Sequence, residues 1–382
     1  MVQLKKISFF LFVYFMFPLW QSGTAQKDES LILTFKKHKG PVYSIAASPD
    51  GSTIASSGDD RFIHLWDKNS GEIRSTLNGP LKPVKYLTFS RDGKLLLGAG
   101  GTEIRIWDLG DGSWTKYSRH VTHVYNLDFN QDASKFLSTS LKNIFYLWDR
   151  EEATVIHTFE GHSKTVLTAT FSPDMQWIAS GSLDQTVIIW DAKTRKPVHT
   201  MSAHGGNIFS LDFSPDSKLL ASCSMDENIK IWDVETGKIH KLLTGHDYAV
   251  VFVRFSPDAR YLISASYDMT AKLWEVATGK CIYTFVDQKD ALYAADFVPG
   301  GSQVLTCSND GTVMIYEISP RFSAEYYYFD EIEKEMENSG LFEARRKGEN
   351  RDAYNTRQEK AALFRRDLFE KYYQKHLLDL DE

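Results

Sequence analysis

The chain has 382 residues, of which 42% are hydrophobic and 25% charged, and its formal net charge is −6. The apolar fraction is that of a folded protein, which excludes wholesale disorder. Affinity for nucleic acid comes mainly from clustered positive charge, so we expect no nucleic-acid partner. The three cysteines are too few, and odd in number, for a disulfide framework.

Residues 1–25 have the three parts of a secretory signal peptide. Two lysines supply the positive start, an apolar run spans Ile7 to Trp20, and small residues end at Ala25. The run is shorter than the roughly 20 apolar residues of a membrane-spanning helix. We therefore predict cleavage before Gln26, no membrane span in the mature chain, and an exported protein, periplasmic or secreted, of a bacterial envelope. Retention of the segment as an uncleaved anchor is the alternative.

A repeat covers most of the remaining chain. Its marker is a Trp-Asp dipeptide or a close variant, spaced by 41 or 42 residues: Trp66-Asp67, Trp107-Asp108, Trp148-Asp149, Trp190-Asp191, Trp232-Asp233, Trp274-Glu275 and Tyr316-Glu317. Short β-prone runs such as Trp177–Ser182 and Thr186–Trp190 alternate with turn sequences inside each unit. Four short strands per repeat of this length are typical of one propeller blade.

On these motifs, residues 31–318 resemble the WD-repeat family of seven-bladed β-propellers. The resemblance implies an all-β fold, a seven-bladed β-propeller over residues 26–320. It also implies that the N-terminal strand Leu31–Phe35 completes the last blade, where only three other strands can be found. Such closure removes an exposed sheet edge.

The family also implies a hydrogen-bonded tetrad of His, Ser or Thr, Asp and Trp inside each blade. Blades 4, 5 and 6 match it in full, with His162, Ser180, Asp184 and Trp190; His204, Ser222, Asp226 and Trp232; and His246, Ser264, Asp268 and Trp274. Blade 1 fits the spacing with His38, Ser56, Asp60 and Trp66. The other blades depart from the pattern: Lys142 takes the Asp position of blade 3, Gln288 and Tyr316 take the His and Trp positions of blade 7, and Pro80, Gly98 and Gly100-Gly101 replace the polar members in blade 2.

The strand pattern ends at Pro320, and residues 321–382 form a charged, helical C-terminal tail. We predict helices over about 329–346 and 351–378, because Phe364, Leu368 and Tyr372 recur on one face of the second. The aromatic run Tyr326–Phe329 is expected to anchor the tail on the last blade. Three interpretations stay open: an appendage packed against the propeller, a docking helix for a partner, or partial disorder.

The recurring Ser, His and Asp do not indicate catalysis. A catalytic triad is needed once and exposed, whereas this set recurs in four blades with a Trp ten residues after the Ser. His120 and His123 have no further His or Cys at a zinc-like spacing, and no Gly-rich phosphate loop precedes a helix. The sequence therefore predicts no enzyme, no metal and no cofactor.

In the WD-repeat family, partners bind the top face around the central channel. Aromatic residues and methionine are enriched at interfaces. The partner-binding residues predicted here are Tyr43, Tyr125, Leu183, Phe209, Met225, Tyr267 and Tyr293. The sequence thus predicts an exported, non-enzymatic protein–protein interaction scaffold in a periplasmic or cell-surface assembly, with a second contact through the C-terminal helices.

Three alternatives remain. The rings could merely plug the channel mouth, the same face could belong to a propeller enzyme or a carbohydrate-binding lectin, or the helical tail could be the binding element.

Overall fold

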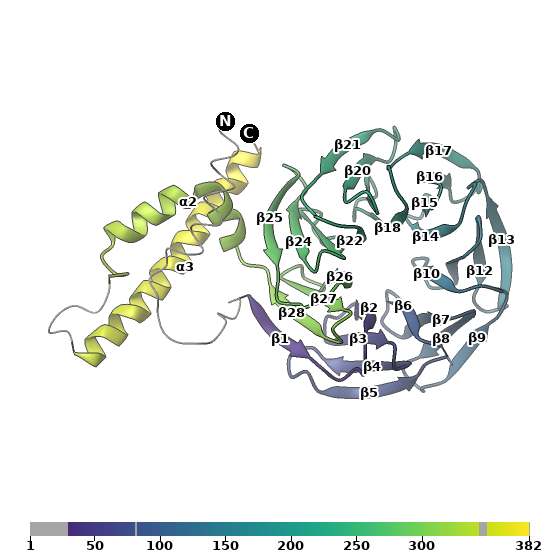
Figure 1. Ribbon diagram of the computed structural model, residues 1–382, viewed down its shortest axis with the longest axis horizontal. Helices are drawn as coiled ribbons and strands as arrows, with labels where there is room; N and C mark the ends of the chain where they lie inside the picture. Colours follow the sequence, from purple (N-terminus) through teal and green to yellow (C-terminus); the bar gives the residue numbers. More distant parts are fainter. Residues whose placement is uncertain (1–29, 81, 344–349, 382) are drawn as a thin grey trace.

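Four-stranded antiparallel sheets arranged in a ring make up most of the molecule (Figure 1). The computed structural model describes residues 30–80, 82–343 and 350–381, so the predicted signal peptide lies outside the described residues. Each sheet runs from an inner strand near the axis of the ring to an outer strand at its rim. The seven sheets are the blades of a β-propeller, and the predicted fold class is confirmed.

The blades are named in chain order, and their strands are given from the axis outward. Blade 1 contains β2 (Val42–Ala47), β3 (Thr53–Gly58), β4 (Phe62–Asp67) and β5 (Ile73–Asn78). Blade 2 contains β6 (Val84–Phe89), β7 (Leu95–Gly100), β8 (Glu103–Asp108) and β9 (Trp114–Tyr117). Blade 3 contains β10 (Val124–Phe129), β11 (Lys135–Ser140), β12 (Ile144–Asp149) and β13 (Thr154–Glu160). Blade 4 contains β14 (Val166–Phe171), β15 (Trp177–Ser182), β16 (Thr186–Asp191) and β17 (Pro197–Ser202). Blade 5 contains β18 (Ile208–Phe213), β19 (Leu219–Ser224), β20 (Ile229–Asp233) and β21 (Ile239–Leu243). Blade 6 contains β22 (Val250–Phe255), β23 (Tyr261–Ser266), β24 (Ala271–Glu275) and β25 (Lys280–Phe285). Blade 7 joins β26 (Leu292–Phe297), β27 (Gln303–Ser308) and β28 (Val313–Glu317) to β1 (Leu31–Phe35).

The last blade is built from both ends of the propeller sequence. β1 pairs antiparallel with β28, with Leu31 opposite Tyr316 and Phe35 opposite Val313. The Phe35 ring then stacks face to face on Trp66 of blade 1, with ring centroids 4.4 Å apart. The strand therefore closes the sheet of blade 7 and also contributes to the core that blade 7 shares with blade 1.

The hydrophobic cores lie between neighbouring blades. Successive side chains of a strand point to opposite faces of its sheet, so each blade packs on both of its neighbours. Between blades 4 and 5, for example, Val187 and Ile189 share one cluster with Ile208, Phe213 and Trp232, all buried. Full burial of one such side chain contributes roughly 1.5–3 kcal/mol.

Polar bonds near the axis add a second link between blades. The Asp128 carboxylate of blade 3 accepts hydrogen bonds from the Phe171 N–H (2.8 Å) and the Thr170 hydroxyl (2.9 Å) of blade 4. Asp212 of blade 5 accepts from the N–H of Phe255 (2.7 Å) in blade 6. Burial raises the pKa of Asp128 and of Asp212 to about 6. These bonds fix the inner strands relative to one another.

The connecting loops divide into two sets by face, because antiparallel strands alternate in direction. One face carries the loops that lead from each outer strand to the next inner strand, together with the turns between the second and third strands of each blade. We call this the top face. The other face carries the turns between the first and second strands and between the third and fourth.

The tail forms two packed helices, α2 (Arg321–Asn338) and α3 (Arg351–Asp381). The prediction for the first helix was wrong: it begins at Arg321 rather than residue 329 and ends before residue 346. The aromatic residues read as an anchor are themselves helical, and Ala324, Tyr328 and Ile332 place one face against Leu368, Phe369 and Tyr372 of α3. The helix ends where Gly340 takes a φ of +63°. Among the described residues, no helix has the length and apolar composition to cross a membrane.

The tail packs chiefly on blade 6, not on the last blade as the sequence suggested, although Phe322 also joins the core that blade 6 shares with blade 7. Phe322 stacks on Tyr283 of β25, with ring centroids 3.7 Å apart. Buried Glu275, at the end of β24, accepts a hydrogen bond from the Tyr327 hydroxyl (2.6 Å), and its other oxygen lies 2.6 Å from Nε2 of His376 in α3. Both helices are therefore attached to the same edge of the propeller (Figure 1).

Ring closure predicts a large difference between two substitutions in β1. Phe35→Ala should destabilise the protein by about 3–5 kcal/mol, because it leaves a cavity against Trp66. Ile32→Ala should cost within about 0.5 kcal/mol, because an exposed side chain loses little packing; Ile32 is 45% exposed. Urea denaturation of both variants measures the difference, and equal losses would contradict the closure role of β1.

Candidate partner-binding face

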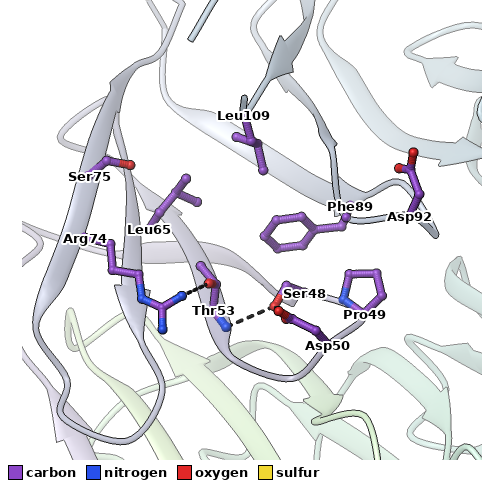
Figure 2. Close-up of a pocket in the computed structure, with 11 residues that line it drawn as sticks. Ser48, Pro49, Asp50, Thr53, Leu65, Arg74, Ser75, Phe89, Asp92 and Leu109 are labelled. Carbon is purple, nitrogen blue, oxygen red and sulfur yellow. Dashed lines mark hydrogen bonds between the residues drawn. The ribbon is translucent and has the colours of Figure 1, made fainter. Parts of the chain in front are cut away.

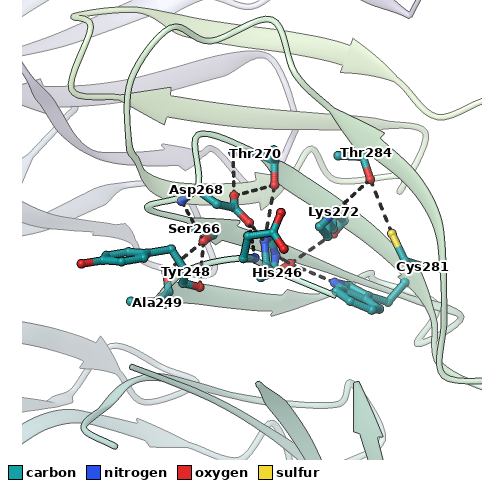
Figure 3. Close-up of polar contacts among 12 residues, drawn as sticks. His246, Tyr248, Ala249, Ser266, Asp268, Thr270, Lys272, Cys281 and Thr284 are labelled. Carbon is teal, nitrogen blue, oxygen red and sulfur yellow. Dashed lines mark hydrogen bonds and ion pairs between the residues drawn. The ribbon is translucent and has the colours of Figure 1, made fainter. Parts of the chain in front are cut away.

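The predicted tetrads of blades 4, 5 and 6 come together inside their blades. In blade 4, His162 Nδ1 lies 3.0 Å from the Asp184 carboxylate and Nε2 lies 2.8 Å from Ser180 Oγ, to which Trp190 Nε1 donates at 2.9 Å. The same His–Asp, His–Ser and Trp–Ser contacts occur in blades 5 and 6, with distances of 2.7–3.1 Å between the bonded atoms. Figure 3 shows His246 of blade 6 among its partners.

Burial and hydrogen bonding set the charge states within this network. Burial lowers the pKa of His162, which favours the neutral ring. Burial alone would raise the pKa of Asp184, but hydrogen bonds from Thr186 and Ser163 and the nearby His162 hold it at about 2. Ser180 is fully buried, so a substrate cannot reach its hydroxyl. The arrangement stabilises a blade and offers no exposed nucleophile.

The other blades keep only part of the network. In blade 1, His38 contacts Asp60 and Ser56, but Trp66 Nε1 is buried without a hydrogen-bond partner among the described residues. In blade 3, His120 contacts Ser138 at 2.7 Å, and burial together with the Lys142 charge lowers the His120 pKa to about 4.

Blade 7 uses different groups at these positions. Gln288 donates to Thr312 Oγ1 at 3.3 Å, and the Tyr316 hydroxyl donates to Met314 Sδ at 3.1 Å. The sheet therefore forms with or without the full tetrad.

One group of potential metal ligands lies within the described residues. His38, Asp60 and His64 of blade 1 place one ligand atom each within 4.8 Å of one another. His38 Nε2 is already bonded to Ser56, and His64 Nδ1 to Thr76. We interpret this group as the blade 1 tetrad with an additional histidine beside it.

Three of the predicted partner-binding residues form a row of tyrosines on the top face, across blades 1, 7 and 6. The rings of Tyr43 and Tyr293 meet edge to face at 5.2 Å, and those of Tyr293 and Tyr267 at 5.9 Å. The Tyr43 hydroxyl donates to Asp59 and the Tyr293 hydroxyl to Asn309. These contacts hold the rings in place, and burial raises the pKa of Tyr293 to about 12.

The other predicted residues lie on blades 3, 4 and 5, outside this row. Met225 is 54% exposed, Tyr125 is also exposed, and Leu183 is half-buried. Phe209 is half-buried and packs against the core between blades 5 and 6, so it contributes to stability as well as to the surface.

The predicted set omits several exposed apolar residues of the top face, among them Tyr248 and Val121. Tyr248 is 56% exposed and points away from the tetrad in Figure 3, and Val121 is 72% exposed. Each follows its tetrad histidine by one or two positions, in the loop that enters the inner strand. That position in the repeat is the signal that could have identified them.

A pocket of about 350 Å³ lies between blades 1 and 2, away from the top face (Figure 2). Leu65 and Phe89 contribute apolar surface, and Arg74 donates to Thr53 Oγ1 at 2.6 Å at its rim. Thr53 begins the second strand of blade 1 and is small. Trp177 and Tyr261 begin the second strands of blades 4 and 6, and they pack into the cores that these blades share with the next ones. The small Thr53 side chain leaves space between blades 1 and 2 that larger residues fill in blades 4 and 6.

Comparison with known proteins agrees with the repeat. A profile described as "WD domain, G-beta repeat" (WD40) matches residues 29–67, 71–108, 153–191, 195–233, 237–275 and 279–317. Residues 109–152, which hold β9 of blade 2 and the three inner strands of blade 3, lie outside these matches.

Individual relatives match shorter stretches. The chain is 31% identical to Periodic tryptophan protein 2 of Arabidopsis thaliana over 121 residues, 31% of this chain and 13% of that protein. It is 42% identical to Small ribosomal subunit protein RACK1 of Caenorhabditis elegans over 74 residues, 19% of this chain and 22% of that protein. It is 33% identical to COMPASS component SWD3 of Saccharomyces cerevisiae over 124 residues, 32% and 39% of the two chains. The matches thus span well under two thirds of these relatives.

The hydrogen-bond pattern predicts that equivalent serines differ in importance. Ser180→Ala removes the partner of both His162 and Trp190, whereas Ser56→Ala removes only that of His38. Since a lost buried hydrogen bond costs about 1–3 kcal/mol, Ser180→Ala should be more destabilising by at least about 1 kcal/mol. Thermal and urea unfolding measure this, and equal destabilisation would show that the Trp190 bond contributes nothing.

Proposed function

Because the chain belongs to the WD40-repeat family, we propose that it is a non-enzymatic interaction scaffold whose top face binds a protein partner. The observation that carries this proposal is the row of Tyr43, Tyr293 and Tyr267 on that face, held by mutual ring contacts. Preformed aromatic surface costs little ordering entropy on binding, which suits a recognition site.

The distribution of polar groups favours binding over catalysis. The repeated Ser, His and Asp side chains are engaged with one another inside the blades, and the serines are fully buried. The top face instead presents aromatic and apolar side chains on several blades. A partner that spans the propeller axis would contact most of them at once.

The names of two relatives support membership of a larger assembly. One is a protein of the small ribosomal subunit and another a component of COMPASS. By analogy, we propose that this propeller is a constituent of a multiprotein assembly, in the periplasm or at the cell surface.

Export is the second part of the proposal, and it is supported by the tripartite sequence of residues 1–25. Expression in the native cell should yield a mature protein that begins at Gln26 and fractionates with the envelope. N-terminal sequencing of the purified protein measures this. A mature chain that begins at Met1, or that stays in the cytoplasm, would refute export while leaving the top-face proposal intact.

Partner capture tests the top face against the helical tail. Tyr267→Ala with Met225→Ala removes exposed surface from blades 6 and 5, and we expect at least about thirtyfold weaker capture, since a hot-spot truncation costs about 2 kcal/mol or more. The thermal melt should change little, because both side chains are exposed. Pull-down from the native envelope with quantitative mass spectrometry provides the measurement.

The matched control lies on the helices. Tyr326→Ala with Leu363→Ala removes comparable exposed surface from α2 and α3, and Tyr326 is 37% exposed, as is Tyr267. This variant should capture the same proteins as the parent chain. Loss of capture by the helix variant, with retention by the top-face variant, would assign binding to the tail.

A further inference from the structure

The top face is divided into sectors of opposite charge, although the chain as a whole is acidic. The loops of blades 5 to 7 on this face (203–207, 225–228, 244–249, 267–270, 286–291 and 309–312) carry seven acidic residues and one lysine, Lys289. The corresponding loops of blades 2 and 3 (79–83, 101–102, 118–123 and 141–143) contain no Asp or Glu. They carry Lys82, Arg119 and Lys142, all exposed, and exposed Lys85 follows at the start of β6.

Contacts between the loops show that the basic residues belong to one region. Gly101 of blade 2 lies beneath Lys82, since a Cβ on this glycine would meet the lysine side chain at 2.9 Å. The Gly101 carbonyl accepts a hydrogen bond from the N–H of Val124, the first residue of β10 in blade 3 (2.8 Å). On the blade 3 side, the Lys142 charge contributes to the lowered pKa of His120.

Nearby carboxylates are few and already engaged. Glu103, the first residue of β8, pairs with Arg105 and Lys116. Asp59 of blade 1 accepts the Tyr43 hydroxyl. The ammonium group of Lys85 lies over the Tyr43 ring, 4.7 Å from its centroid, and the Arg119 guanidinium lies 5.5 Å from the centroid of the Tyr146 ring. The positive charge of this sector is therefore not neutralised locally.

Exposed apolar side chains alternate with the basic ones in the same loops of blade 3. Val121 lies two residues after Arg119, Leu141 directly precedes Lys142, and Tyr125 is the second residue of β10; all three are exposed. Exposed apolar side chains that are grouped and surrounded by polar residues are typical of an interaction surface.

The same residues explain why blade 3 departs from the tetrad. Lys142 occupies the position of Asp184 in blade 4, and His120 consequently has no carboxylate partner, although it keeps its bond to Ser138. Blade 3 thus lacks a buried hydrogen bond that other blades have, and gains a cation at the surface.

We propose that this basic and apolar surface, formed by Lys82, Lys85, Arg119, Val121, Tyr125, Leu141 and Lys142, binds an acidic peptide segment of the partner. The segment would alternate carboxylates with apolar side chains. The inference rests on the proposed top-face function and specifies the chemistry of the partner. A peptide fits better than nucleic acid, because the acidic loops of blades 5 to 7 would repel a polyanion that extends across the face.

Fluorescence anisotropy with the full chain tests the surface. The probe is a labelled peptide in which glutamate alternates with leucine and serine, and the matched peptide has lysine for each glutamate. We expect only the acidic peptide to bind. Its affinity should fall as NaCl rises from about 50 to about 300 mM, because salt screens exposed charges.

Charge-reversal variants identify the sector. Lys142→Asp with Arg119→Glu should weaken binding of the acidic peptide by about tenfold or more, since both changes replace attraction by repulsion. Lys142→Asp also restores the aspartate of the repeat beside His120, so the thermal melt should not fall for that variant. The control is Lys289→Asp, an exposed lysine of the same face in the acidic sector, which should change binding by less than about twofold.

Several outcomes would overturn the proposal: no binding of the acidic peptide to the parent chain, equal weakening by Lys289→Asp, or tighter binding of a single-stranded oligonucleotide than of the peptide. Native capture separates this inference from the proposed function. If Tyr267→Ala with Met225→Ala abolishes capture and the charge-reversal variant does not, the top face binds a partner but not through an acidic segment. If neither variant affects capture, the top-face function itself fails.

Discussion

The pairing of β1 with β28 is the constraint on which the rest of the structure depends. A blade buries its two faces only against neighbours, so an open ring would leave two apolar sheet faces in water and an unpaired edge at β28. β1 prevents this by joining the two ends of the repeat array in one sheet. Phe35 then packs on Trp66 and continues the core into blade 1. Local repeats thereby become a single cooperative unit.

Closure also determines what the top face can do. The inner strands are linked across blades by Asp128 and Asp212, which accept backbone N–H groups of the next blade, and by Arg254, which bridges Asp212 and Asp296 of the two blades beside it. Loops attached to such a frame keep their relative positions. A tyrosine row drawn from three blades, and a basic sector drawn from two, can therefore act as preformed surfaces.

The sequence alone predicts what the repeat specifies and fails where contacts between distant residues decide. Period and turn chemistry predict the blades, including the three inner strands of blade 3, which the family profile does not match although Trp148 and Ser138 remain in place. The repeat position alone could not distinguish Phe209, which packs against a core, from Tyr125, which is exposed at the same position of blade 3, because contacts with the neighbouring blade decide how far each side chain is covered. The bounds of α2 were missed because its first turns are stabilised by Tyr283 of a distant strand.

Departures from a repeat carry more functional information than agreement with it, because packing explains the agreement. In blade 5 the aspartate of the dipeptide, Asp233, accepts from its own turn at Thr236. Blade 6 has Glu275 instead, whose longer side chain still bonds Thr278 and also reaches Tyr327 and His376 of the tail. Glutamate occupies the same position in blade 7, but Glu317 is exposed and the tail packs on blade 6. The longer glutamate side chain therefore allows the blade to bond the helical tail. The aromatic surface around Tyr283 determines which of the two blades the helices pack on. Lys142 is a similar departure on the top face. It replaces the aspartate of the repeat and changes the surface charge, while the sheet of blade 3 still forms.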